Sequence, residues 1–138
     1  MTSRPLILVV EDDPETRLYY QSLFELDGFR TEQAHNGLQA LEKALAGSPN
    51  LIIADIAMPG IDGIELCRRL RADDRTKSIP VLAITGYGDR HYSARAIQAG
   101  ANQVLIKPCL PQMLVAEARR LLPPSMDRDQ QAVDRVAE

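Results

Sequence analysis

Residues Leu51–Leu66 read LIIADIAMPGIDGIEL, and this stretch contains both kinds of element from which the fold is built. Its beginning, Leu51–Ala54, is a short and wholly apolar run, which is typical of a buried strand in a parallel sheet. Its end opens an amphipathic segment, Gly63–Ala72, whose apolar residues recur at the spacing of one helix face. The stretch therefore predicts a buried strand, a turn, and a helix that covers the strand.

The same unit recurs along the whole chain. Five apolar runs alternate with segments of helical periodicity, which predicts an α/β fold with a parallel sheet, helices on both faces and right-handed crossovers. The predicted strands are Leu6–Val10, Arg30–Ala34, Leu51–Ala54, Val81–Ile84 and Gln103–Ile106. The first predicted helix has a buried face of Thr16, Tyr19, Leu23 and Leu26, and the second has one of Leu38, Leu41 and Leu45. The third has a buried face of Ile64, Leu66, Cys67 and Leu70. The fourth and fifth helices are predicted over Asp89–Ala99 and Met113–Leu122.

Residues with specific stereochemistry mark the helix ends. Asp13 precedes Pro14, which places a side-chain acceptor before a proline at the first helical position. Gly28 and Gly100 each follow a helical segment, as expected of C-terminal caps that need positive φ. These positions support the predicted boundaries of the first and fourth helices.

The composition excludes several classes of function. A chain of 138 residues suffices for one domain with a sizeable core, and its net charge of −3 lacks the basic excess of a nucleic-acid binder. The longest apolar run, Leu6–Val10, is too short for a signal peptide or a membrane span, which predicts a cytoplasmic protein with no membrane contact. Cys67 and Cys109 lack metal-site spacing and are predicted to be reduced packing residues.

The composition changes near the C-terminus. Pro123-Pro124 is expected to end the fifth helix, and the residues that follow are mostly polar. Residues 1–122 are therefore predicted to form the domain, and residues 123–138 a polar tail or linker, with a frayed helix as the alternative.

Functional side chains follow four of the predicted strands. Carboxylates come after the first strand, at Glu11 and Asp12, and after the third, at Asp55, while Thr85 and Lys107 follow the fourth and fifth. The carboxyl ends of parallel strands meet at one edge, so these groups should converge. Clustered carboxylates repel one another unless a cation is supplied, and Mg²⁺ prefers such hard oxygen ligands. An aspartate in that setting can be phosphorylated, with an ammonium and a hydroxyl placed to stabilise the phosphoryl oxygens.

Five stretches of the chain resemble the response-regulator receiver domains of bacterial two-component systems. They read ILVVEDDPETR, AHNGLQAL, LIIADIAMPGIDGIEL, IPVLAITGYG and AGANQVLIKP, and they occur in the order typical of that family over about residues 5–122. The resemblance implies a flavodoxin-like, doubly wound sheet of five parallel strands in the order 2-1-3-4-5 with five helices. It also implies a signalling protein, not an enzyme, with a histidine kinase or phosphotransfer protein as phosphoryl donor.

The resemblance also assigns roles to individual residues. It makes Asp55 the phosphoacceptor, Thr85 the switch hydroxyl and Lys107 the lysine of the site. It implies that Mg²⁺ is held by Glu11, Asp12, Asp55 and the carbonyl of Ala57. The bond between Lys107 and Pro108 is commonly cis in the family, and we expect it to be cis here.

The sequence departs from the family pattern at two positions near the lysine. A tyrosine or phenylalanine is frequent three residues before that lysine, and its ring moves when the switch hydroxyl moves; this chain has Val104 there. The residue after the lysine-proline pair, often phenylalanine, is Cys109. Tyr87 could instead lie over the acceptor and, with the small Ala57, screen the phosphoryl group from water.

Three classes of function are compatible with these residues. The first is a phosphorylation-dependent switch, either a stand-alone receiver or part of a longer regulator. The family resemblance implies that such a switch binds a downstream protein through its fourth helix, fifth strand and fifth helix, and dimerisation is possible. The second is a receiver-like interaction module independent of phosphorylation, which the valine at position 104 favours. A magnesium-dependent phosphohydrolase is the third, although little of the chain could build a substrate pocket.

Asp13 is expected to be a helix cap, and His35 and His91 are expected to be surface residues.

Overall fold

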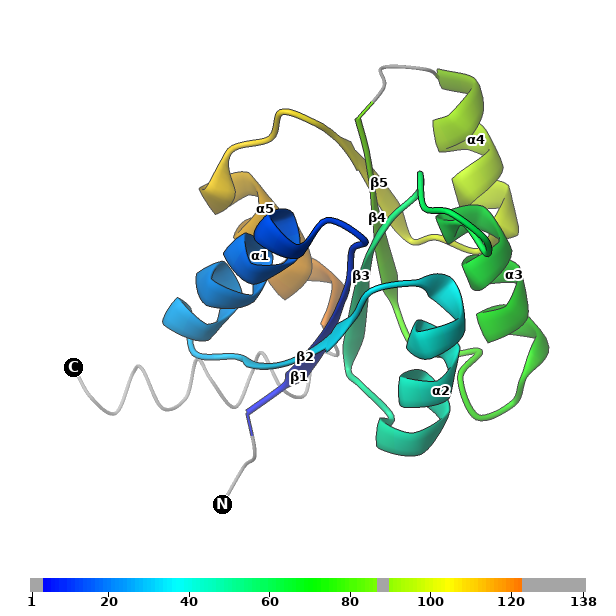
Figure 1. Ribbon diagram of the computed structural model, residues 1–138, viewed down its shortest axis with the longest axis horizontal. Coiled ribbons are helices and arrows are strands. Elements are labelled where there is room, and N and C mark those ends of the chain that lie inside the picture. Colours follow the sequence, from blue (N-terminus) through cyan, green and yellow to red (C-terminus); the bar gives the residue numbers. More distant parts are fainter. Residues whose placement is uncertain (1–3, 87–89, 123–138) are drawn as a thin grey trace.

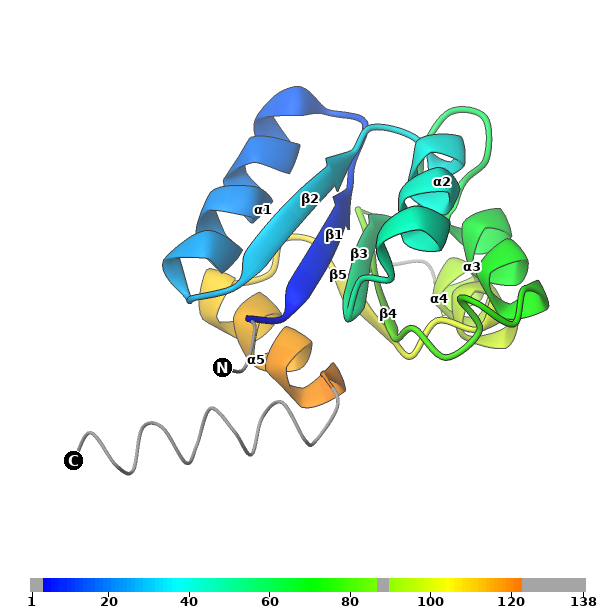
Figure 2. The same cartoon turned by 90° about the horizontal axis from the view of Figure 1, so that it is seen from below.

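The sheet and its helices have the predicted flavodoxin-like arrangement. The computed structural model describes residues 4–86 and 90–122, in which five parallel strands lie in the order β2-β1-β3-β4-β5 (Figure 1). Helices α1 and α5 cover one face of the sheet, and α2, α3 and α4 cover the other (Figure 2). The strands are β1 (Leu6–Val10), β2 (Arg30–Ala34), β3 (Leu51–Asp55), β4 (Val81–Thr85) and β5 (Gln103–Ile106). The helices are α1 (Pro14–Leu26), α2 (Gly37–Gly47), α3 (Gly63–Ala72), α4 (Arg90–Ala99) and α5 (Pro111–Leu121).

Most of the predicted boundaries are confirmed. The Asp13 carboxylate accepts a hydrogen bond from the Thr16 amide at 2.9 Å, and Gly28 and Gly100 have φ values of 95° and 119°. The fifth helix begins at Pro111, two residues before the predicted start, because a proline at the first helical position costs no hydrogen bond. The predicted start of the fourth helix, Asp89, and the predicted tail, 123–138, lie outside the described residues.

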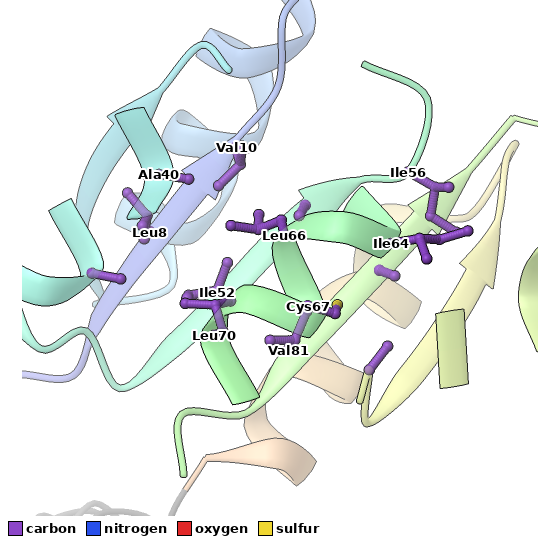
Figure 3. Packing of buried hydrophobic residues seen from close by; sticks show 14 of the residues in the cluster. Leu8, Val10, Ala40, Ile52, Ile56, Ile64, Leu66, Cys67, Leu70 and Val81 are labelled. Carbon is purple, nitrogen blue, oxygen red and sulfur yellow. The ribbon is translucent and has the colours of Figure 1, made fainter. Parts of the chain in front are cut away.

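Two hydrophobic clusters fill the space between the sheet and its helices. Successive strand residues point to opposite faces, so Leu8 and Val10 of β1 join the cluster under α2, α3 and α4 (Figure 3), whereas Ile7 and Val9 join the cluster under α1 and α5. The predicted face of α3 is confirmed, since its four apolar residues are all buried. The two clusters hold the strands from both sides and fix the position of their carboxyl ends.

The predicted buried faces of α1 and α2 are partly wrong. In α1, Tyr20 and Phe24 are buried, while Tyr19 is 50% exposed and Leu26 is 89% exposed. The aromatic residues Tyr20 and Phe24, one position along from the predicted stripe, face the sheet instead. The rings of Phe24 and Phe29 make an edge-to-face contact with their centroids 6.1 Å apart. In α2, the buried residues are Gly37, Ala40 and Ala44, whereas Leu38 is 55% exposed. Small residues let α2 lie close to its neighbours: a Cβ at Gly37 would stand 2.6 Å from the carbonyl oxygen of Ile61.

The two edges of the sheet differ in character. Strand β2, with the sequence RTEQA, forms one edge, and all its side chains except Ala34 are partly or fully exposed. Strand β5 forms the other edge and contains only four residues. Within the described part of the chain, none of the helices is both long enough and apolar enough to cross a bilayer.

Arg71, at the end of α3, ties that helix to the loop between α4 and β5. Its guanidinium donates hydrogen bonds to the carbonyl oxygens of Gly100 and Ile79, each at 2.8 Å, and to the side-chain oxygen of Asn102 at 3.0 Å. The Gly100 carbonyl belongs to the residue directly after α4. Arg71 therefore fixes the C-terminal end of α4 to α3.

We expect the substitution Arg71→Ala to lower the free energy of unfolding by about 2–3 kcal/mol, because several charge-assisted hydrogen bonds are lost and their acceptors are left without this donor. Urea denaturation followed by circular dichroism measures the change. Arg75→Ala is the matched control: the ion pair of Arg75 with Asp73 is 69% exposed on the arginine side, and such surface pairs contribute little. Equal effects of the two substitutions would contradict this account of Arg71.

Candidate functional site

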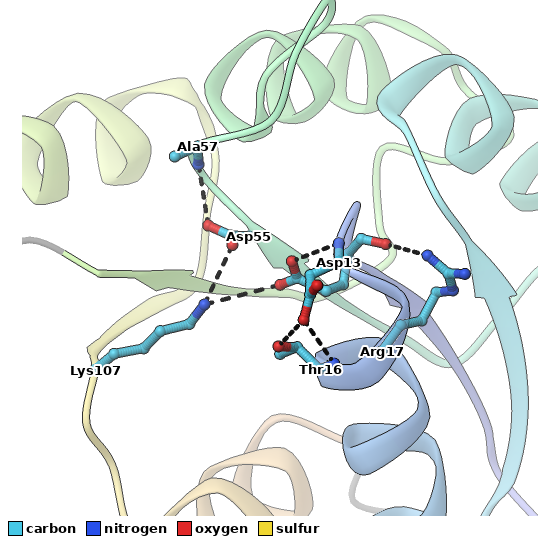
Figure 4. Close-up of polar contacts among 7 residues, drawn as sticks. Asp13, Thr16, Arg17, Asp55, Ala57 and Lys107 are labelled. Atoms are coloured by element: carbon cyan, nitrogen blue, oxygen red, sulfur yellow. Dashed lines mark hydrogen bonds and ion pairs between the residues drawn. The ribbon is translucent and has the colours of Figure 1, made fainter.

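The residues predicted to converge follow the carboxyl ends of the strands, and Figure 4 shows two of them, Asp55 and Lys107, facing each other. Glu11 directly follows β1, Asp55 is the last residue of β3, Thr85 is the last residue of β4, and Lys107 directly follows β5. Each of these strands is parallel to its neighbours, which brings the four positions to the same edge. The prediction that these positions lie at one edge of the sheet is confirmed.

Three carboxylates form the acidic part of the site. Oxygen atoms of Glu11, Asp12 and Asp55 all lie within 4.8 Å of one another. Glu11 is 2% exposed and Asp55 is 8% exposed, whereas Asp12 lies on the surface. Within the described residues this is the one cluster of three or more side chains able to bind a metal, and His35 and His91 are exposed and not part of it.

Glu11 is the carboxylate of this cluster whose charged form is most disfavoured by its surroundings. Burial, together with the neighbouring Asp55, raises the pKa of Glu11 from 4.5 to about 8, against the lowering effects of the Asp13 amide and Lys107. Its Oε1 accepts a hydrogen bond from the Asp13 amide at 3.1 Å. Its Oε2 is buried and accepts no hydrogen bond. A buried carboxylate oxygen without a hydrogen-bond donor is stabilised by a proton or by a cation, and the Lys107 ammonium lies beyond hydrogen-bonding distance of it, at 3.8 Å.

Lys107 provides the positive charge on the other side of Asp55. Its Nζ lies 3.2 Å from Oδ2 of Asp55 and 3.8 Å from Oε2 of Glu11. The backbone holds this side chain in place, because the Lys107 amide donates a hydrogen bond of 2.7 Å to the Thr85 carbonyl oxygen. The peptide bond between Lys107 and Pro108 is cis, as the family resemblance implied.

The loop that follows β3 surrounds the remaining part of Asp55. The Ala57 amide donates a hydrogen bond of 3.0 Å to Oδ1 of Asp55, and the Ala57 side chain is exposed. Thr85 is 2% exposed on the adjacent strand. A cleft of about 260 Å³ lies here; it is lined by Ile56, Ala57, Met58, Asp62, Thr85 and Tyr92. Tyr87, the other residue predicted near the acceptor, lies outside the described residues.

Sequence reasoning missed two residues that position the site. Arg17 donates a hydrogen bond of 2.8 Å from its guanidinium to the carbonyl oxygen of Glu11, which fixes the backbone of the acidic pair (Figure 4). Gly63 opens α3, and a Cβ at this position would stand only 2.7 Å from the carbonyl oxygen of Asp55. The signal for Arg17 is its place one turn into α1, four residues after the helix cap. The glycine carries no comparable signal, because its role depends on how α3 approaches β3.

The two cysteines are free thiols in different surroundings. Cys67 is buried in the core, where burial raises its pKa to about 11. Cys109 is half-buried and lines a second cleft, of about 420 Å³, between α1 and the segment that joins β5 to α5. The prediction that Cys67 is a packing residue is thus confirmed.

The donor set fits a hard divalent cation. Its ligand atoms are carboxylate oxygens, and the buried Oε2 of Glu11 lacks a hydrogen-bond donor that it would otherwise need. Two of the three carboxylates lie in a largely dry environment, where an added positive charge is most stabilising. The site residues present in this chain are therefore compatible with Mg²⁺.

Comparisons with known proteins agree with this geometry. The profile of the response regulator receiver domain family matches residues 7–119. The chain is 35% identical over 118 residues to the DNA-binding dual master transcriptional regulator RpaA of Synechocystis, and 34% identical over 116 residues to the phosphate regulon transcriptional regulatory protein PhoB of Pseudomonas aeruginosa. These matches cover 86% and 84% of this chain but 49% and 51% of the relatives, so the chain spans about half their length.

Solved structures of similar proteins have the same fold. The signal receiver domain of a signal transduction histidine kinase from Syntrophus aciditrophicus matches with a TM-score of 0.80 at 35% identity, over 86% of this chain and 89% of that one. The chemotaxis protein CheY4 of Vibrio cholerae matches with a TM-score of 0.82 at 28% identity, over 87% of this chain and all of that one.

Proposed function

Because the chain belongs to the response regulator receiver domain family, we propose that it is a phosphorylation-dependent signalling switch whose phosphoacceptor is Asp55. The observation that carries this proposal is the position of the Asp55 carboxylate. It is nearly buried at the carboxyl edge of the sheet, 3.2 Å from the Lys107 ammonium and next to two further carboxylates. In this proposal residues 1–122 form the receiver domain, and residues 123–138 are a tail or linker.

The proposed reaction transfers a phosphoryl group from a phosphohistidine of a histidine kinase or phosphotransfer protein. A carboxylate oxygen of Asp55 forms a bond to phosphorus while the bond between phosphorus and the imidazole nitrogen breaks. The electron pair of the broken bond stays on the imidazole, which is then free to take up a proton. Lys107 balances the negative charge of the transferred group, and the Thr85 hydroxyl donates a hydrogen bond to one of its oxygens.

Four residues would hold Mg²⁺ in this site: Glu11, Asp12 and Asp55 through carboxylates, and Ala57 through its carbonyl oxygen. When bound, the ion supplies positive charge to the phosphoryl oxygens and relieves the repulsion among the carboxylates. The chain's own contribution is to fix these oxygens in place: Arg17 holds the backbone of Glu11, and the Ala57 amide orients the Asp55 carboxylate.

The downstream partner is proposed to be a protein that contacts α4, β5 and α5. Exposed apolar side chains lie on all three elements, at Ile97, Ile106 and Met113, each 45–49% exposed. A second copy of the chain could bind the same face. The relatives RpaA and PhoB are described as transcriptional regulators and are about twice as long as the matched region, so their output is not carried over to this chain.

A second candidate function is an interaction module of the same fold that phosphorylation does not switch. The observation that favours it is Val104, which stands on β5 where many family members have an aromatic ring. The two candidates differ in one measurable property, namely whether Asp55 becomes phosphorylated and whether the structure responds.

Incubation with Mg²⁺ and acetyl phosphate, followed by intact mass spectrometry, tests the proposed function. We expect the mass of one phosphoryl group to be added, and we expect hydroxylamine to remove it, because an acyl phosphate is cleaved by this nucleophile whereas a phosphoserine or phosphothreonine is not. A chain that gains no mass in the presence of Mg²⁺ supports the unswitched interaction module instead.

A further inference from the structure

Thr85 and Val104 share one face of the sheet. Strand side chains alternate between faces, so Val81, Ala83 and Thr85 of β4 point to the side covered by α3 and α4. Ala83 is paired in register with Val104 of β5, and Val104 packs against the same cluster. On this side of the sheet β5 therefore places Val104 beside Ala83 and Ile106 beside Thr85; both side chains are aliphatic, and neither is a ring.

Helix α4 contributes an aromatic ring, Tyr92, to the same side of the sheet. Ala96 of α4 is 1% exposed and packs on the cluster that contains Ala83. Tyr92 precedes Ala96 by four residues, which puts it on the same face of the helix, one turn closer to the carboxyl edge of the sheet. Tyr92 consequently lines the 260 Å³ cleft together with Thr85.

The ring of Tyr92 lies at the mouth of this cleft. The residue is 41% exposed, and the guanidinium carbon of Arg95 lies over its ring, 5.7 Å from the ring centroid. The cleft also has apolar walls, Ile56 and Met58, which are both buried. The ring thus adjoins both an apolar space and an exposed cationic partner, and both are favourable environments for it. A small change in the shape of the cleft can shift the ring between the two.

The other end of α4 is held in place. Arg71 donates hydrogen bonds to the Gly100 carbonyl oxygen and to Asn102, directly after the helix. A displacement of α4 is therefore easiest at its first turn, which carries Tyr92.

We propose that Tyr92 is the aromatic residue that responds to phosphorylation in this chain, by moving from the mouth of the cleft into it beside Thr85. The inference rests on the proposed function, since it requires Thr85 to turn its hydroxyl to a phosphoryl group on Asp55. That rotation enlarges the cleft on its apolar side, and the ring fills the added space. The movement withdraws Tyr92 from Arg95 and changes the surface at the start of α4, where a partner protein can detect it.

Fluorine NMR of the full chain labelled with 3-fluorotyrosine tests this proposal. The chain has four tyrosines, and Tyr92→Phe identifies the resonance of Tyr92 by its loss. Acetyl phosphate with Mg²⁺ is the phosphoryl donor, and intact mass of the same sample gives the phosphorylated fraction. We expect the Tyr92 resonance to shift in proportion to that fraction. The resonance of Tyr19, a comparably exposed ring on the opposite face of the sheet, is the reference and should shift much less.

Two further variants give the proposal its sharpest test. Thr85→Val, compared at an equal phosphorylated fraction, should leave the Tyr92 resonance at its unphosphorylated position, because the hydroxyl that moves has been removed. Asp55→Asn should show neither a mass gain nor a shift. A protein that gains the phosphoryl mass while the Tyr92 resonance stays unchanged overturns this proposal and leaves the proposed function intact. A wild-type chain that gains no phosphoryl mass overturns both.

Discussion

The substitution Asp55→Asn is expected to abolish phosphorylation by acetyl phosphate in the presence of Mg²⁺. A side-chain amide has almost no nucleophilicity toward phosphorus, whereas the carboxylate of Asp55 lies next to Lys107 and accepts a hydrogen bond from the Ala57 amide. No other carboxylate of the cluster combines burial with a lysine ammonium within hydrogen-bonding distance, as far as the described residues show. Intact mass spectrometry under conditions that fully modify the wild type measures the loss.

Asp13→Asn is the matched control for this experiment. Asp13 lies at the same edge of the sheet, but its carboxylate caps α1 by accepting hydrogen bonds from Thr16, and asparagine is an equally good cap. The control removes one negative charge near the site without removing the acceptor, so we expect its phosphorylation to continue. If Asp55→Asn still gained the phosphoryl mass, the assignment of Asp55 as acceptor would be wrong.

The substitution Glu11→Gln is expected to stabilise the metal-free protein at neutral pH by up to about 3 kcal/mol. The pKa of Glu11 is about 8 in the folded protein against 4.5 for the model carboxyl group, so the folded protein retains a proton that the unfolded chain has released. The free energy of unfolding therefore falls as the pH rises from about 4.5 to about 8 and changes no further above that range. Glutamine carries no charge and removes this dependence.

Urea denaturation between pH 4 and pH 9, with a chelator present, measures this effect. The wild type should lose stability toward the alkaline end and the Glu11→Gln variant should not. Asp12→Asn is the control in the same cluster: Asp12 is exposed, so its removal should change the metal-free stability little. Both variants should gain less stability from added Mg²⁺ than the wild type does, because each loses a carboxylate ligand. Identical pH profiles for the wild type and Glu11→Gln would contradict the buried, proton-binding state of Glu11.

The alternation of strands and helices was predicted from local sequence patterns, whereas the strand order was implied by the family resemblance. Apolar runs such as Leu51–Ala54, which is buried at every position, are typical of strands in a parallel sheet covered on both faces. The convergence of Asp55, Thr85 and Lys107 then follows from topology alone, without any knowledge of side-chain contacts.

The sequence did not predict the features that depend on how closely, and at what rotation, a helix packs against the sheet. Leu26 belongs to the apolar stripe of α1, yet it is 89% exposed, because the sheet packs against the adjacent row that contains Phe24. The contact of Gly63 with Asp55 and the bond of Arg17 to the Glu11 carbonyl are likewise consequences of packing distance. A periodicity shows that a helix has a buried side but leaves its rotation uncertain by about one residue.

The edges of the sheet limit how this protein can aggregate. An exposed strand edge is a template for adding a strand from another molecule, but charged residues and short edge strands both oppose such pairing. Strand β2 carries Arg30 and Glu32, which a second chain would have to desolvate, and β5 offers only four residues for pairing. Sheet extension from one molecule to the next, the route to fibrils, is therefore disfavoured at both ends.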